Sequence, residues 1–94
     1  MNLKFVLVTT NKDRKGVFAG LLKSHDGDKV VLLEARNAIY WSSDVRGFLG
    51  LAATGPSKQC KISKAVRELE LDGVTSISIC TDVAKAAWEQ EPWA

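Results

Sequence analysis

A β-hairpin is predicted by the stretch that decides the fold, GVFAGLLKSHDGDKVVLLE at residues 16–34. Residues 16–23 are mostly apolar, and as a strand they would place Val17, Ala19 and Leu21 on one face and Phe18, Gly20 and Leu22 on the other. Residues 29–34 resume the apolar pattern with Val-Val-Leu-Leu. Between them lies the Asp26-Gly27 dipeptide, which favours the tight turn that joins antiparallel strands. The sequence therefore predicts two antiparallel strands over residues 16–23 and 29–34.

Further strands are predicted on both sides of this hairpin. Residues 2–9 are apolar on both alternating faces, which is typical of a strand that is buried on both sides. Residues 35–41 end in Ile-Tyr-Trp and predict a fourth strand. Residues 69–81 predict a second hairpin, because the Asp72-Gly73 dipeptide separates two β-favouring runs.

A helix of about residues 82–91 is predicted near the C-terminus. Thr81 or Asp82 can cap it and Pro92 ends it. Four side chains at helical spacing form its apolar face: Val83, Ala84, Ala87 and Trp88. Trp88 is therefore expected in the core, whereas Trp93 is expected to dock on its own domain or on a partner subunit.

The middle of the chain is less regular. Residues 48–53 are small and apolar and lead to Gly55-Pro56, where proline disfavours a helix, so a loop or a bent edge strand is expected. Residues 61–67 are compatible with a short helix or a strand. Taken together, the elements predict one mainly β (α+β) domain over residues 1–94: a small antiparallel, barrel-like sheet with one C-terminal helix.

Composition indicates a folded protein of the cytoplasm. Of the 94 residues, 46% are hydrophobic and 26% are charged, and the net charge is only +2, with basic residues scattered along the chain. A protein that binds duplex DNA usually has a stronger basic footprint, so we expect no DNA partner. No signal peptide or membrane span is expected, and Cys60 and Cys80 are too few for a disulfide framework.

Catalytic and metal-binding patterns are weak in this sequence. The only histidine, His25, lies in the predicted hairpin turn, and the two cysteines are too far apart in sequence for a metal-ligand motif. The pairs Glu68/Glu70 and Asp26/Asp28 fit a solvated strand face and a turn better than acid–base chemistry. We therefore expect a binding protein and not an enzyme, with no metal and no cofactor.

Two segments have residue types that suit an anionic, aromatic ligand. Aromatic rings stack on nucleobases, arginine offers a planar fork to phosphate, and a glycine-containing loop can present main-chain N–H groups to an anion. For each ring, burial in the core is an equally good interpretation, and the loop can be an ordinary turn. The candidate ligand-binding residues are Arg36, Asn37, Tyr40, Trp41, Thr54, Gly55, Ser57 and Lys58.

The order of short motifs along the chain resembles a family of short phage-encoded proteins that form a domain of unknown function. The motifs are Val8-Thr9-Thr10, Arg14 with Gly16-Val17-Phe18, and residues 26–28, 35–41, 50–56, 73–75 and 80–81. This family is similar to the viral sponge proteins of the anti-CBASS and anti-Thoeris kind, which sequester the cyclic nucleotide signals of bacterial defence. The resemblance implies tight, non-hydrolytic binding of a cyclic dinucleotide such as cGAMP, or of a cyclic ADP-ribose derivative. It further implies a homo-oligomer, a dimer or tetramer, in the host cytoplasm.

Two other functions stay open at this point. Residues 16–41 are loosely similar to the bent strands of Sm-like and SH3-like small barrels, which would make the chain an RNA-binding module. The third possibility is a phage structural or protein-interaction protein that acts through exposed strand edges and the terminus around Trp93.

Overall fold

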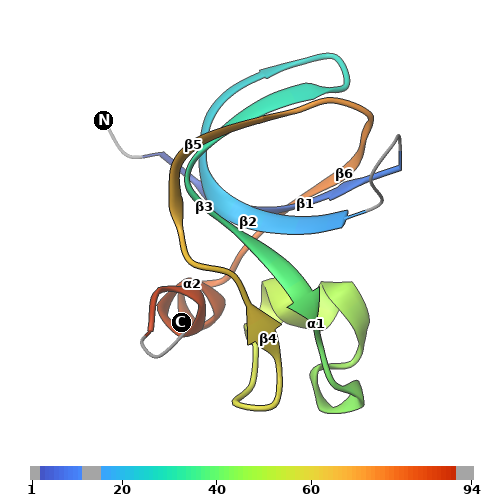
Figure 1. The fold of residues 1–94 in the computed structure, drawn as a ribbon, viewed down its shortest axis with the longest axis vertical. Coiled ribbons are helices and arrows are strands. Elements are labelled where there is room, and N and C mark those ends of the chain that lie inside the picture. The colour runs from blue at the N-terminus through green and yellow to red at the C-terminus, as the bar shows by residue number, and fades with distance from the viewer. Residues whose placement is uncertain (1–2, 12–15, 91–94) are drawn as a thin grey trace.

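The computed structural model describes residues 3–11 and 16–90, and Figure 1 shows their arrangement. The strands are β1 (Phe5–Thr10), β2 (Gly16–Asp26), β3 (Lys29–Tyr40), β4 (Lys61–Ile62), β5 (Val66–Leu71) and β6 (Val74–Ile79). The helices are the 3₁₀ turn η1 (Ser43–Val45), α1 (Gly47–Ala53) and α2 (Asp82–Glu89). A mainly antiparallel β domain with a C-terminal helix is thereby confirmed. The predictions for Arg14, Pro92 and Trp93 lie outside the described residues.

The predicted first hairpin is confirmed, and its strands are longer than expected. Asp26 pairs with Lys29 around the turn, where Gly27 has φ +61°. The two strands predicted over residues 29–34 and 35–41 are one strand, β3. Glu34 has φ +52° and the β2–β3 register shifts there, so a β-bulge bends the strand without ending it.

The sheet has the order β4-β3-β2-β1-β6, and β5 also pairs with β3. β5 lies along the first half of β3, from Val30 to Ala35, and β4 lies beside its end. The prediction of a second hairpin over residues 69–81 is wrong, because β5 pairs with β3 whereas β6 pairs with β1. No ladder joins β5 to β6 among the described residues, so the sheet is strongly curled but is not closed into a barrel (Figure 1).

The curl is held at the point where β5 turns into β6. Asp28, in the turn between β2 and β3, accepts a hydrogen bond from Gly73 N–H at its Oδ2 (3.2 Å) and one from Val74 N–H at its carbonyl (3.0 Å). A two-residue link therefore joins two strands that belong to different edges of the sheet. The Asp72-Gly73 dipeptide thus lies between two strands as predicted, but β5 pairs with β3 and β6 pairs with β1.

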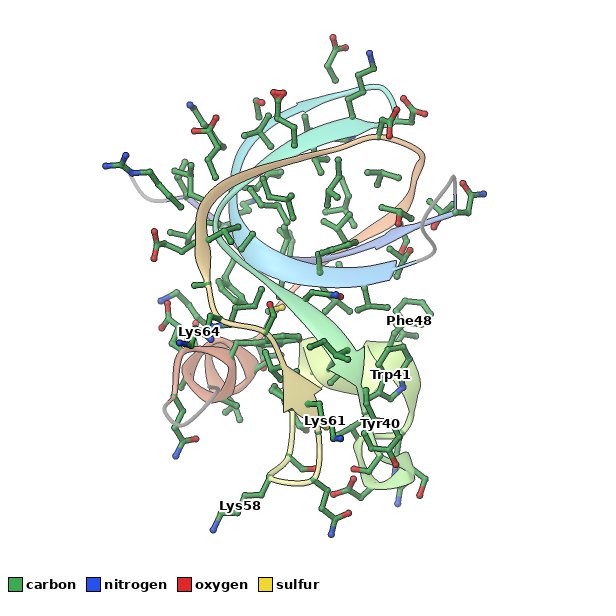
Figure 2. All side chains as sticks on the ribbon, in the orientation of Figure 1. Tyr40, Trp41, Phe48, Lys58, Lys61 and Lys64 are labelled. Carbon is green, nitrogen blue, oxygen red and sulfur yellow. The ribbon has the colours of Figure 1, made fainter. Side chains whose placement is uncertain are left out.

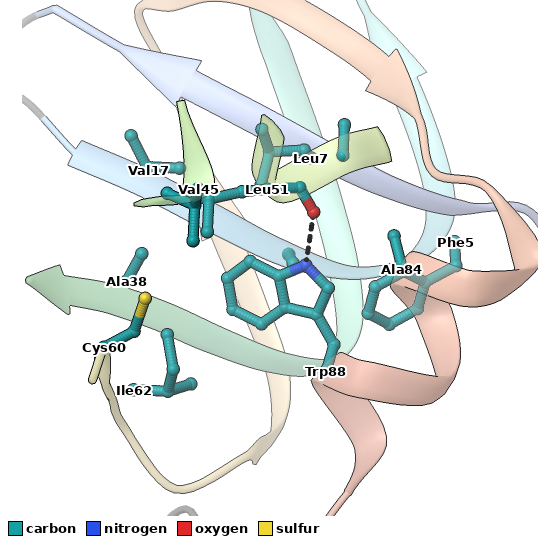
Figure 3. Packing of buried hydrophobic residues seen from close by; sticks show 12 residues of the cluster. Phe5, Leu7, Val17, Ala38, Val45, Leu51, Cys60, Ile62, Ala84 and Trp88 are labelled. Carbon is teal, nitrogen blue, oxygen red and sulfur yellow. Dashed lines mark hydrogen bonds between the residues drawn. The ribbon is translucent and has the colours of Figure 1, made fainter. Parts of the chain in front are cut away.

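The sheet separates two hydrophobic cores, and β1 contributes to both. Val6 and Val8 point into the curl, where they pack with Val30, Leu32 and Ala35. Phe5 and Leu7 point to the other side, where they pack against residues of α1 and α2 and form what we call the outer core (Figure 3). The expectation that this strand is buried on both faces is confirmed.

Residues 48–53 form most of helix α1, so the prediction of a loop or bent strand there is wrong. Phe48, Leu51 and Ala52 follow one another at the i, i+3, i+4 spacing of an apolar helix face and pack into the outer core. Pro56 comes after the helix has ended and therefore does not oppose it. Residues 61–67, which the sequence left undecided, form β4 and the start of β5.

Helix α2 begins as predicted and places Trp88 in the core. Thr81 Oγ1 accepts the N–H of Ala84 at 3.0 Å, which is an N-cap hydrogen bond. Trp88 is 0% exposed, and its indole N–H donates to the Leu51 carbonyl at 3.0 Å (Figure 3). Val83 is 67% exposed, so its assignment to the apolar face is wrong. It lies about 100° round the helix from Ala84 and about 140° from Trp88, and so points away from the sheet.

None of the helices in the described part of the chain is both long and apolar enough to cross a membrane.

Candidate functional site

An open groove of about 710 Å³ lies where the ends of β1, β2 and β3 meet α1 and β6. Its volume falls within the range of about 300–1,000 Å³ in which small-molecule sites are usually found. The lining residues come from five separate elements and from the start of the segment after β3: Thr9, Thr10, Gly16, Val17, Asn37, Ala38, Ile39, Trp41, Phe48, Thr75 and Ser76.

Two aromatic side chains form one part of this groove. Trp41 follows the last residue of β3, and Phe48 lies in the first turn of α1 (Figure 2). Both are half-buried, both pack against the outer core, and both also line the groove. Because their core contacts hold the rings in place, they offer rigid surfaces on which a flat ligand ring can stack.

Hydroxyl groups form another part of the groove. Thr9 Oγ1 lies 2.7 Å from Thr75 Oγ1 and 2.6 Å from Ser76 Oγ, so three side chains of β1 and β6 form one hydrogen-bonded group. Asn37 adds an amide. Carboxylate, imidazole, thiol and ammonium groups are absent from the described lining. This combination suits an uncharged polar edge, such as that of a nucleobase.

The predicted segment 36–41 is divided by the structure. Asn37 and Trp41 line the groove, whereas Arg36 lines a separate cavity of about 230 Å³ together with Trp88 and Glu89. Arg36 Nη1 also donates to the Ser63 carbonyl at 2.9 Å. The arginine and the tryptophan that the sequence grouped together thus lie in different cavities.

Tyr40 has a third environment. Its ring is 52% exposed and it does not line the groove. Its partner in the β3–β4 ladder is Lys61, and the two side chains extend on the same side of the molecule in Figure 2. An exposed aromatic ring beside an ammonium group is a surface that suits the phosphate-bearing part of a ligand.

The loop at residues 54–58 does not form the anion cradle that its glycine suggested. The main-chain N–H groups of Thr54 and Gly55 both donate to the Gly50 carbonyl, at 2.8 and 3.2 Å, and Thr54 Oγ1 donates to the same oxygen at 3.0 Å. These donors close the end of α1 and are not free for an anion. Thr54 and Gly55 therefore have structural roles in this loop.

Gly55→Ala is expected to destabilise the protein by more than the same change at Gly27. Gly55 has φ +82°, and a Cβ there would lie 2.5 Å from Ala87 Cβ and 3.0 Å from the Ala84 carbonyl oxygen in α2. Gly27 has φ +61°, but nothing lies within 4 Å of an added Cβ. Both changes have the left-handed backbone cost of about 1–2 kcal/mol, and only the first also pushes α2 away. Urea unfolding of the two variants measures the difference, and equal losses would contradict this packing role.

Ser57 belongs to a small polar cluster with Ser42 and Asp44. Ser57 Oγ lies 3.3 Å from Asp44 Oδ1, and the Ser42 hydroxyl also donates to that oxygen. The hydrogen bond from Ser42 is the main cause that holds the pKa of the Asp44 carboxyl below its usual value. A carboxylate at this place disfavours a phosphate next to Ser57. Lys58, in contrast, is exposed at the tip of the loop (Figure 2).

Charge is strongly segregated along this chain, although its basic residues look scattered. Residues 35–67 hold six basic side chains and one acidic side chain, whereas the rest of the chain holds seven basic and ten acidic ones. This middle segment forms the end of β3, α1 and β4, which lie opposite the β2–β3 turn in Figure 1. The segment that holds Trp41 and Phe48 therefore has a net positive charge.

Several residues of the groove were not identified from the sequence as site residues. Thr9, Thr75 and Ser76 lie far apart in the chain and meet only because β1 pairs with β6. Phe48 falls in a stretch for which the sequence predicts a loop or a bent edge strand, although its spacing to Leu51 and Ala52 is helical. That spacing was the one signal that would have placed Phe48 beside Trp41.

A family model described as a domain of unknown function (DUF6948) matches residues 3–88. Neither a curated protein nor a solved structure gives a significant match. Since the match spans both cores and every described residue of the groove, the chain belongs to the DUF6948 family.

Proposed function

We propose that this protein binds a nucleotide in the groove beside Trp41 and holds it without changing it chemically. The observation that carries the proposal is a pair of core-anchored aromatic rings in the same groove as a cluster of hydroxyl groups. Stacking of a base on an aromatic side chain contributes about 1–3 kcal/mol. The hydroxyls and the Asn37 amide would then hydrogen-bond to the edge of the base.

The charge distribution supports an anionic ligand over a free base. Residues 35–67 have a net excess of five positive charges, and Asp44 is the single acid among them. Tyr40, the last residue of β3 and the residue directly before Trp41, pairs with Lys61 of β4. A nucleotide whose base occupies the groove would place its phosphates beside this positively charged segment.

The residues around the groove support storage of the ligand and not its turnover. The described lining contains hydroxyl groups but no carboxylate, imidazole, thiol or ammonium group that could act as the general base to activate one of them. Burial raises the pKa of the Cys80 thiol to about 11, so this thiol is protonated near neutral pH. His25 is exposed and its Nε2 lies 2.9 Å from the Gly27 carbonyl, in the turn of the first hairpin.

The biological setting of this proposal comes from the resemblance to phage sponge proteins. On that basis the ligand would be a cyclic nucleotide signal of bacterial defence, either a cyclic dinucleotide such as cGAMP or a cyclic ADP-ribose derivative. The protein would act as a phage anti-defence factor in the host cytoplasm, as a homo-oligomer. Neither activity on DNA nor association with a membrane is part of this proposal.

Calorimetry with 3′,3′-cGAMP, cyclic ADP-ribose and AMP tests the proposal. We expect saturable binding of one of the two cyclic ligands, weaker binding of AMP, and intact ligand in the supernatant after the protein is denatured. A cleaved product would show that the protein is an enzyme. Absence of heat and of thermal stabilisation with all three ligands would contradict nucleotide binding, since a ligand at 100 times its Kd stabilises a protein by about 2.7 kcal/mol.

A salt titration separates this function from the RNA-binding alternative. RNA affinity falls with salt with a log–log slope of about 0.7 per phosphate contacted on a single strand. A small ligand that makes two phosphate contacts would show a correspondingly small slope. Binding of single-stranded oligo(U) with a steep slope, together with no response to the cyclic ligands, would establish the RNA-binding function instead.

A further inference from the structure

Strand β6 forms one end of the sheet, and one of its two sides is open. β6 pairs with β1, and Cys80 N–H donates to the Phe5 carbonyl at 2.9 Å in the same register. In an antiparallel ladder, hydrogen-bonded residues alternate with residues whose main-chain groups point the other way. Ser76 and Ser78 therefore bond to β1, and the N–H and C=O groups of Ile77 and Ile79 point to the open side.

Main-chain hydrogen bonds cover this side of β6 at each end of the strand. At one end, Val74 N–H donates to the Asp28 carbonyl, and at the other, Thr81 N–H donates to the Ala52 carbonyl of α1, both at 3.0 Å. Between these two bonds, no partner is found within residues 3–11 and 16–90 for the outward main-chain groups of Ile77 and Ile79. The result is a short window of free strand edge.

The second edge strand, β5, differs in chemistry from this window. β5 carries Arg67, Glu68 and Glu70, and charged side chains of this kind oppose edge-to-edge pairing. β6 has the sequence VTSISI, without a charge or a proline, and Ile79 at its end is 61% exposed. Within the short window at Ile77 and Ile79, no charged side chain opposes the approach of another strand.

We propose that β6 pairs in antiparallel fashion with β6 of a second copy of this chain. Two copies of β6 can approach each other without like-charge repulsion, because the strand VTSISI carries no charge. Antiparallel self-pairing produces a closed two-fold dimer, in which every free donor of one edge meets an acceptor of the other. Because Thr75 and Ser76 line the groove, the second copy would border both nucleotide sites. The interface itself does not depend on what the groove binds.

The variant Ile79→Lys tests this interface, with Val66→Lys as its matched control. Val66 is also an exposed β-branched residue, 48% exposed, but it lies on β5. We expect the wild type and Val66→Lys to sediment as dimers, and Ile79→Lys to sediment as a monomer with an unchanged far-UV circular dichroism spectrum. A wild type that remains monomeric at about 1 mM, a concentration at which even weak complexes form, would overturn the proposal, as would a dimeric Ile79→Lys.

Amide hydrogen exchange provides a second readout that does not rely on a substitution. In the proposed dimer, Ile77 N–H is bonded across the interface and exchanges about as slowly as Ser78 N–H, which is bonded to β1. On dilution to monomer, only the Ile77 and Ile79 amides are expected to become fast. A dimer in which Ile77 N–H exchanges quickly would use another surface, and this result would overturn the proposal.

Discussion

Trp88→Ala is expected to lower the free energy of unfolding by about 3–5 kcal/mol, the usual cost of removing a large aromatic side chain from a core. Trp88 is fully buried between α1, α2 and the outer face of the sheet (Figure 3). The change also removes the indole N–H that donates to the Leu51 carbonyl. That carbonyl belongs to a buried residue and would lose its side-chain partner, which adds to the cost of the cavity.

The size of the domain makes this effect decisive. A protein of 94 residues has a total stability of about 5–14 kcal/mol, so the loss is a large share of it. Urea unfolding followed by far-UV circular dichroism measures it. Val83→Ala is the control, because Val83 lies on the same helix and is exposed, and we expect a change below about 0.5 kcal/mol. Similar losses in the two variants would contradict the central position of Trp88.

Trp41→Ala is expected to weaken nucleotide binding by about 5- to 150-fold, which corresponds to about 1–3 kcal/mol of lost stacking. Trp41 is half-buried and lines the groove, so its truncation removes part of the surface on which the base would lie. Trp41→Phe retains a ring and is expected to restore much of the affinity. Calorimetry with the cyclic ligand that binds the wild type measures both changes.

Leu49→Ala is the matched control for this experiment. Leu49 follows Phe48 in α1, is 61% exposed and does not line the groove, so no change of affinity is expected. A melting curve shows whether each variant is folded. If a folded Trp41→Ala bound the nucleotide as tightly as the wild type, the groove would not be the binding site. If the variant failed to fold while Trp41→Phe remained stable, the role of the ring would be in the core.

The features predicted correctly from the sequence are those that depend on neighbouring residues. The Asp26-Gly27 turn, the N-cap at Thr81 and the buried Trp88 each follow from contacts or conformations within a few positions. The alternating residues of β1 also indicated burial on both faces, and both cores contain them. Such features are fixed by turn geometry, helix capping and side-chain periodicity, which operate locally.

The errors have a common cause, which is that pairing partners are chosen over long distances. The Asp72-Gly73 turn looks like a hairpin turn. In the curled sheet, however, the strand before it, β5, pairs with β3, and the strand after it, β6, pairs with β1. Residues 48–53 look like a loop or a bent edge strand because they lead into Gly55-Pro56. They are nevertheless helical, because Leu51 and Ala52 find a core on the sheet to pack against.

The sequence by itself determined that this is a β-rich domain, and it led us to expect that aromatic, hydroxyl and basic side chains form a ligand site. Only the tertiary structure decided which of them meet. Arg36 and Asn37 are adjacent in sequence, yet they line different cavities, because successive residues of a strand point to opposite faces. Trp41 and Ser76 are 35 positions apart, yet they line one groove, because the curled sheet and α1 bring their strands and loops together.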